Sequence, residues 1–416
     1  MTASQLMTSL ARYVAFMLLS WRLMPKALDE VAVYLSSALV LGSICDLGVN
    51  VTCLRFSAAR SGKARLEVER RFLLIRNVLS SVVLCAVWFG ATQIATHILG
   101  RPDLKVALRM AVVTALCGSY SSFILTLLQA RMRFVRLSAI SSLSAILQLA
   151  LIAVAYAGGH LSLKILFASD VLGKVIIVAA HTRLLAAIFK TRPIRGIIAA
   201  WREMIGFSQW ITVSFVVGAV QNYVPVILLS RAGSGGELAR YNIGLALSGG
   251  FSLFLAAVMS VTMPEALKAT TPAQRASYVK GVLPAALVFA ALSIPIAWFG
   301  APLAAHIVGK QFLAGIQVFR FLTIAQIFLV VTNPIQFLLY GMNRVKLCTA
   351  GDALIAILFC VAGAMLRDVM SAPGVALALL LCQTATKVAL MGFVLKLVFW
   401  TRETPSLTIS DAVLSE

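Results

Sequence analysis

Residues 373–400 read PGVALALLLCQTATKVALMGFVLKLVFW, and the only charged side chains among them are Lys387 and Lys396. An α-helix that crosses a bilayer needs about 20 predominantly apolar residues. No water reaches the hydrocarbon core to bond a backbone N–H or C=O group, so a single apolar segment crosses it only as a helix. This stretch therefore predicts a transmembrane α-helix.

The remainder of the chain continues the same pattern. Hydrophobic residues make up 60% of the sequence, charged residues make up 12%, and the mean hydropathy is +0.94. This composition excludes an ordinary soluble domain, which carries about 25% charged residues. The apolar runs do not alternate as barrel strands do, so we predict an all-α polytopic membrane protein with about twelve transmembrane helices. The expected spans are 5–24, 31–54, 72–97, 106–128, 136–157, 162–189, 204–231, 240–264, 279–300, 313–340, 347–366 and 373–400.

The chain also carries a weak internal repeat. Short motifs recur at a separation that drifts slowly around half the chain length. The matching pairs are Tyr34 with Tyr241 (207 apart), Gly100 with Gly309 (209 apart) and Arg133 with Arg344 (211 apart). Six spans in each half keep the halves parallel, related by an axis along the membrane normal. We therefore predict two pseudo-symmetric six-helix lobes around a central cavity, an arrangement that is typical of transporters.

The spans also define the expected domains. The first lobe covers 1–189 and the second covers 204–400, with a short basic linker at 190–203 on the cytoplasmic surface and a cytoplasmic tail at 401–416. Every connection between the expected spans is too short to hold a catalytic domain. We therefore expect that the protein is not an enzyme.

The formal net charge of +21 has two possible explanations. In a soluble protein such a charge would favour nucleic-acid binding, but the sequence contains no basic soluble module that could bind a nucleic acid. Lysine and arginine concentrate in alternate loops, and the positive-inside rule places these loops in the cytoplasm. This predicts a bacterial inner-membrane protein with both termini in the cytoplasm.

The stretch 55–76 is especially basic. It is either a plain topology determinant or a surface that recruits anionic head groups at about 1 kcal/mol per cation. The residues expected on this cytoplasmic basic surface are Arg55, Arg60, Lys63 and Arg65.

Cysteine and histidine give no support for a metal site or a cofactor. The seven cysteines fall in apolar segments and form no CxxC pair, which is the pattern of small buried side chains. The four histidines are scattered along the chain. We expect neither a disulfide framework nor a metal ion.

Polar side chains within the spans are candidates for a substrate cavity, because a charge at the bilayer centre costs at least about 2.5–3.5 kcal/mol. The candidates are Arg12, Asp46, Asp170, Lys174, Asn222 and Lys387. Some of them have structural alternatives. Asp170 and Lys174 lie four positions apart and could neutralise each other. Asp46 could cap or pair with a neighbouring helix, and Arg76 is expected to reach the interface by snorkelling.

Lys174 and Lys387 lie 213 positions apart, in equivalent spans of the two halves. Together with Arg12 they would make a cationic pocket, and lysine and arginine are the residues that bind phosphate. The expected cargo is therefore anionic, for example a lipid-linked diphosphate. Pro225 lies in the middle of its span, where proline frees a carbonyl and kinks the helix, so we predict a hinge there.

The N-terminal quarter resembles a known family. It contains Glu30-Val31-Ala32-Val33-Tyr34, then Asp46-Leu47-Gly48, then Arg55. Wzx-type polysaccharide flippases typically show an acidic-x-x-x-Tyr start to span 2, an Asp-Leu-Gly near its cytoplasmic end and a following Arg. They belong to the multidrug/oligosaccharidyl-lipid/polysaccharide exporter superfamily. The span count, the duplication and the chain length extend the resemblance over nearly the whole chain.

The resemblance implies that undecaprenyl-diphosphate-linked oligosaccharide or polysaccharide repeat units are moved from the cytoplasmic to the periplasmic leaflet by alternating access. It implies lipid-linked oligosaccharide and membrane lipids as partners, with a polysaccharide polymerase and other assembly proteins as further candidates. An ion-coupled small-molecule or multidrug antiporter of the related branch is the alternative, and it would need an essential acid in its cavity. A membrane-bound polymerase or ligase would instead need a large periplasmic loop.

Overall fold

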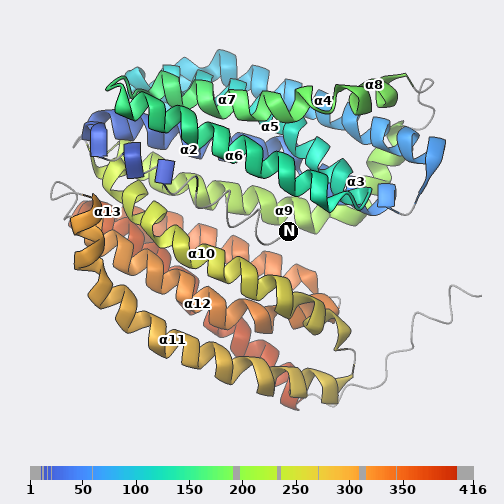
Figure 1. Ribbon diagram of the computed structural model, residues 1–416. Helices are drawn as coiled ribbons and strands as arrows, with labels where there is room; N and C mark the ends of the chain where they lie inside the picture. Colours follow the sequence, from blue (N-terminus) through green and yellow to red (C-terminus); the bar gives the residue numbers. More distant parts are fainter. Residues whose placement is uncertain are drawn as a thin grey trace, which may run out of the picture.

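The computed structural model describes most of the chain, and in these residues it contains helices and no strand. The described ranges are 11, 14–15, 17–19, 21–58, 60–190, 197–231, 236–269, 271–308, 315–342 and 344–400. The helices form two lobes, one above the other in Figure 1, as the duplication predicts. The predicted all-α polytopic architecture is confirmed.

In the first lobe, α2 packs against α5, and α5 in turn packs against α4 and α7. Its helices are α2 (Pro25–Asp46), α3 (Val49–Ala58), α4 (Gly62–Gln93), α5 (Lys105–Ala130), α6 (Phe134–Ala157), α7 (Leu163–Ala179) and α8 (Thr182–Phe189). Two short turns, the π-helical η1 (Ile94–Ile98) and the 3-10 η2 (Pro102–Leu104), connect α4 to α5.

The second lobe is built around α12, which packs against α10, α11 and α13. Its helices are α9 (Ile197–Ser230), α10 (Glu237–Lys268), α11 (Pro272–Val308), α12 (Gly315–Gly341) and α13 (Val345–Trp400). Helix α13 consists of two helices across a kink at Ser371, whose φ is 54° and ψ −130°. The kink falls between the expected spans 347–366 and 373–400.

Eight helices in the described part are long and apolar enough to cross a membrane. Several boundaries differ from expectation; α4, for example, begins at Gly62 and not at position 72. The span expected at 31–54 begins at Pro25 and ends at Asp46, because Leu47 and Gly48 adopt positive φ angles of 38° and 79°. The span expected at 162–189 is divided into α7 and α8 by a turn. The expected span 5–24 lies largely outside the described residues.

The share of buried residues differs widely between the candidate spans and indicates which helices face lipid. In the most apolar window of α12, 72% of the residues are buried, and in that of α5 56% are buried. In α6 only 11% are buried, the smallest share among the eight candidate spans. Helices α5 and α12 are therefore the cores of their lobes, while α6 lies at the periphery.

Close packing of α10 on α12 depends on Gly244. A Cβ atom at this position would lie 2.6 Å from Cγ1 of Val318 and 2.9 Å from the backbone nitrogen of Phe319. Neither atom is the end of a long flexible side chain, so a larger residue would push the helices apart. Gly249 in the same helix has open space at its Cβ position.

We expect that Gly244→Ala lowers the stability of the protein by about 1–3 kcal/mol, because overpacking a close helix contact forces backbone shifts. Gly249→Ala is the matched control, and it should leave stability unchanged or raise it, since alanine favours a helix over glycine by about 1 kcal/mol. Thermal unfolding of the purified protein in detergent measures both. Equal melting temperatures for the two variants would contradict the packing argument.

Candidate functional site

A buried carboxylate joins the two lobes at one end of the molecule. Asp29, 2% exposed, accepts hydrogen bonds from the backbone nitrogens of Gly236 (3.2 Å) and Ala239 (2.8 Å). It also pairs with Arg101 at 2.9 Å. The first N–H groups of a helix have no partner within it and carry partial positive charge. Asp29, at the start of α2, therefore caps α10 of the opposite lobe.

Further bonds hold the same end together. Arg231, just after α9, donates to the carbonyl oxygens of His97 (2.6 Å) and Ile98 (2.7 Å), at the end of the π-helical turn η1. Within the second lobe, Glu237 accepts from the backbone nitrogen of Ala372 at 3.1 Å, at the kink of α13. We call this the bonded end, defined by Asp29, Arg101, Arg231 and Gly236. The opposite end is the basic end, defined by Arg60, Lys63, Arg133 and Arg136.

Sequence reasoning missed the Asp29 contact. The N-cap residue of α10 is Gly236, with φ 108° and no side chain to bond the free N–H groups. Because glycine has no side chain, any side-chain cap for these N–H groups comes from another residue. The sequence does not say from where, because Asp29 lies 207 positions away.

Helix α9 lies along the first lobe, where two hydrogen bonds connect it to α2. The hydroxyl groups of Ser37 and Tyr223 are 3.1 Å apart, and the Thr212 hydroxyl donates to the Leu47 carbonyl at 2.7 Å. Helix α9 also packs against α13. It is therefore the element that is shared between the lobes.

The first lobe has a polar centre around Asp170. The Tyr34 hydroxyl donates to Oδ2 of Asp170 at 2.9 Å and lies 2.9 Å from the hydroxyl of Thr114. Lys174, one turn along α7, forms an ion pair with Oδ1 of Asp170. The helix spacing predicted this pair as a structural alternative, and the structure contains it.

The second lobe has a polar centre around Lys387. Its ammonium lies 2.8 Å from Oδ1 of Asp352 and donates to Oε1 of Gln336 at 3.0 Å. Asp352 lies in the first half of α13 and Lys387 in the second half, so this ion pair crosses the kink. Nε2 of Gln336 is buried and has no hydrogen-bond partner among the described residues.

The two centres are related by the repeat. At the offset of 213 that relates Lys174 to Lys387, Asp170 corresponds to Gln383. The second lobe therefore has an amide where the first has the acid, and Lys387 takes its carboxylate from Asp352. Both lysines are neutralised, each by a different acid. The two lysines were expected to give a cationic pocket. This expectation is corrected, because each lysine forms an ion pair with a carboxylate and brings no net charge.

Asp46 belongs to a third cluster, centred on Arg76. The guanidinium group lies 3.7 Å from the Asp46 carboxylate and donates to Oγ of Ser119 (2.7 Å), to Oγ of Ser122 (2.8 Å) and to the side chain of Asn50. Arg76 is 1% exposed, so the expectation that it snorkels to the interface is wrong. The structure places Asp46 in an ion pair with a neighbouring helix, which is the structural alternative that the sequence offered for this residue.

The remaining expected residues are not gathered into one place. Arg12 lies outside the described residues, as does the Arg55 side chain. Asn222 is exposed, and Pro225 is buried within a continuous α9. Of the basic surface, Arg60 and Lys63 are exposed, whereas Arg65 donates to the carbonyls of Ser57 and Arg60.

We expect Arg76→Met to destabilise the protein by about 3–5 kcal/mol, because it leaves the Asp46 carboxylate without its cation in a largely buried site. Adding Asp46→Asn to it should recover part of this loss, since the unpaired charge is then removed. Arg109→Met is the control: Arg109 is exposed over the Trp88 ring, so it should cost less than about 1 kcal/mol. Thermal unfolding measures all three, and equal losses for Arg76→Met and Arg109→Met would refute a buried ion pair.

Solved structures that are similar to this fold include membrane transporters. A multidrug resistance MATE family transporter of the MOP superfamily, in an inward-facing conformation, matches with a TM-score of 0.71 and 13% identity, over 96% of each chain. The lipid II flippase MurJ, in an inward closed conformation, matches with a TM-score of 0.73 and 11% identity, over 95% of this chain and 87% of that one. An outward-facing MATE transporter gives a TM-score of 0.65 at 13% identity, over 96% of this chain and 93% of its own.

No curated protein matches the chain. A family model described as "Polysaccharide biosynthesis protein" matches residues 1–270. This match confirms the family that the motifs around Tyr34 and Asp46 predicted, and the structural matches show a multi-pass fold that it shares with transporters and flippases. Because the match covers more than half of the sequence, the chain belongs to the polysaccharide biosynthesis protein family.

Proposed function

We propose that the protein moves undecaprenyl-diphosphate-linked oligosaccharide or polysaccharide repeat units from the cytoplasmic to the periplasmic leaflet of the bacterial inner membrane. The observation that carries this proposal is the pair of equivalent lysines, Lys174 and Lys387, one at the polar centre of each lobe. Family membership and the fold of a lipid II flippase support it. The expected domains, 1–189 and 204–400 with linker 190–203 and tail 401–416, are part of this proposal.

The ion pairs suggest how a charged cargo is bound. An unpaired lysine within a bilayer is costly, and the carboxylates of Asp170 and Asp352 remove that cost in the empty protein. A diphosphate carries more negative charge than one carboxylate, so it can replace either acid as the partner of a lysine. The Tyr34 hydroxyl, already bonded to Asp170, then remains to stabilise the released carboxylate. Arg12 is proposed to add a further cation.

Alternating access follows from the distribution of contacts between the lobes. The bonds from Asp29 to α10 and from Arg231 to η1 close the bonded end. Toward the basic end, Figure 1 shows α10, α11 and α12 running away from the first lobe. Matches to both inward-facing and outward-facing transporters support a motion of the lobes. We propose that Pro225 acts as a hinge in α9.

We also propose that the basic end and both termini of the chain face the cytoplasm. A polysaccharide polymerase and other assembly proteins are the proposed protein partners.

A second candidate is an ion-coupled small-molecule or multidrug antiporter. The neutralised lysines favour it, since the acids at Asp170 and Asp352 are then available to an ion or a cationic compound. The fold of the multidrug transporters agrees with both candidates. The cavity between the lobes remains a prediction for either function.

The lysines provide the direct test in proteoliposomes that contain a polyprenyl-diphosphate-linked oligosaccharide. We expect Lys174→Ala and Lys387→Ala each to reduce translocation at least about tenfold, because each loses a phosphate contact worth about 1.5–3 kcal/mol. Lys164→Ala, at an exposed position on α7, is the control and should keep the full rate. The readout is the fraction of oligosaccharide that becomes accessible to an enzyme on the opposite side.

A neutral pair separates transport from folding. Asp170→Asn combined with Lys174→Gln keeps the shape of the pair and removes both charges. We expect a folded protein that does not translocate the diphosphate. Full translocation by this double variant and by Lys387→Ala would eliminate the lysine assignment. Export of a cationic dye that is lost with Asp170→Asn would favour the antiporter.

The bonded end provides a separate test of alternating access. We expect Asp29→Ala to shift the protein toward a state that is open at this end, because α10 loses its cap and Arg101 keeps only Asp103 of its two carboxylate partners in the described residues. Asp29→Asn should have a smaller effect, since asparagine caps helices nearly as well as aspartate. Distances between spin labels on α2 and α10 report the opening. Unchanged distances in Asp29→Ala would show that this contact does not control the end.

A further inference from the structure

One face of α6 is exposed along its whole length. The exposed residues recur every three or four positions, which places them on one side of a helix. They are Arg136, Ala139, Leu143, Ile146, Ala150 and Val154. This stripe begins with a cation at the basic end and continues with apolar side chains only. Because α6 is also the least buried of the eight candidate spans, the stripe faces lipid.

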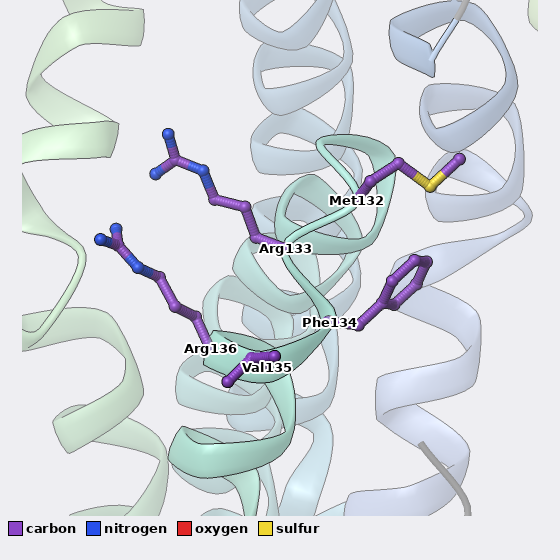
Figure 2. A pocket seen from close by; sticks show the side chains of 5 residues that line it. All are labelled: Met132, Arg133, Phe134, Val135 and Arg136. Carbon is purple, nitrogen blue, oxygen red and sulfur yellow. The ribbon is translucent and has the colours of Figure 1, made fainter.

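The turn before α6 forms a pocket at the head of this stripe. The pocket has a volume of about 430 Å³ and is lined by Met132, Arg133, Phe134, Val135 and Arg136. Figure 2 shows the side chains of Arg133 and Arg136 extending to the same side of the turn, while Met132 and Phe134 extend to the other. The lining thus separates its two cations from the exposed apolar side chains of Met132 and Phe134.

The backbone of the turn is held in place by its own bonds. The N–H groups of Met132 and Arg133 donate to the carbonyls of Gln129 and Leu128, at 3.0 and 2.9 Å. The neighbouring Arg131 forms an ion pair with the buried Glu69 on α4. Arg131 is therefore used within the protein, whereas Arg133 and Arg136 are exposed and have no hydrogen bond or ion pair from their side chains in the described part of the chain.

We propose that the α5–α6 turn binds the phosphate head group of an anionic phospholipid. Arg133 and Arg136 contact the phosphate, and an acyl chain lies on Leu143, Ile146 and Val154. The charge and the polarity of the site match such a lipid along its length, from the head group to the tail. A bilayer lipid fits better than a soluble phosphate, because the apolar part of the stripe continues into the hydrocarbon region. The proposal does not depend on which cargo the protein carries.

The second lobe contains the corresponding turn, which serves as a control. Arg344 donates its backbone N–H to Leu339 as Arg133 does to Leu128. There, however, the ammonium of Lys346 lies over the ring of Trp210 at 5.2 Å, so one of the two cations already has a partner within the protein. The helix that follows this turn also exposes apolar side chains, among them Leu354, Ile357 and Val361, so the two turns differ in their cations and not in the stripe. Replacing its two cations removes the same charge at an equivalent position.

The test titrates the full-length protein in detergent with phosphatidylglycerol or phosphatidylcholine and counts bound lipids by native mass spectrometry. In R133Q/R136Q we expect the affinity for phosphatidylglycerol to fall about 30-fold at the tightest site, since each cation near an anionic surface contributes about fivefold. Affinity for phosphatidylcholine should not change. R344Q/K346Q should retain tight phosphatidylglycerol binding. Millimolar inorganic phosphate should not displace the lipid.

Several outcomes would overturn the proposal. Unchanged phosphatidylglycerol affinity in R133Q/R136Q would do so, as would an equal loss in R344Q/K346Q, which would indicate a general charge effect. Displacement by inorganic phosphate would show that the acyl chain contributes nothing. If R133Q/R136Q does not fold, R136Q and Leu143→Asn replace it. Each must then weaken phosphatidylglycerol binding, and failure of both would reject the site.

Discussion

The high cost of an unpaired charge inside a bilayer governs the interior of this protein. Arg76, Lys174 and Lys387 all lie within long helices, and each has a carboxylate partner. Arg76 also uses hydroxyl and amide groups from neighbouring helices, which satisfies the remaining donors of its guanidinium group. The pairs Asp46–Arg76 and Asp352–Lys387 join different helical segments, so they favour the arrangement in which those helix faces meet. Asp170 and Lys174 instead pair along the single helix α7.

The fold could largely be predicted from the sequence, because long apolar segments permit only helices in a bilayer. The break after α2 could not. Hydropathy stays high across 31–54. It reports how apolar the side chains are and does not reveal that Leu47 and Gly48 adopt left-handed backbone conformations, which end the helix. The division between α7 and α8 was missed for the same reason, since the residues around the turn remain mostly apolar.

Prediction of the candidate site depended on how close the partners are in sequence. The pair of Asp170 and Lys174 was visible because four positions correspond to one helical turn. Asp352 lies 35 positions from Lys387, in a different expected span, and no sequence spacing relates side chains of two separate spans, so that pair was not visible. Arg76 was placed near a span end because the start of α4 at Gly62 was not foreseen. In the structure Arg76 lies well inside α4, where its guanidinium group pairs with Asp46 and does not extend to the membrane interface.

The cap that Asp29 places on α10 has a consequence for biosynthesis. Chains are made from the N-terminus, and N-terminal units fold first. Asp29 leaves the ribosome 72 residues before Arg101 and 207 residues before Gly236. Its carboxylate therefore meets a cation from its own lobe long before the helix that it caps has been translated. Arg101 can hold the acid in position during this interval, so the first lobe presents a prepared docking point when the second emerges.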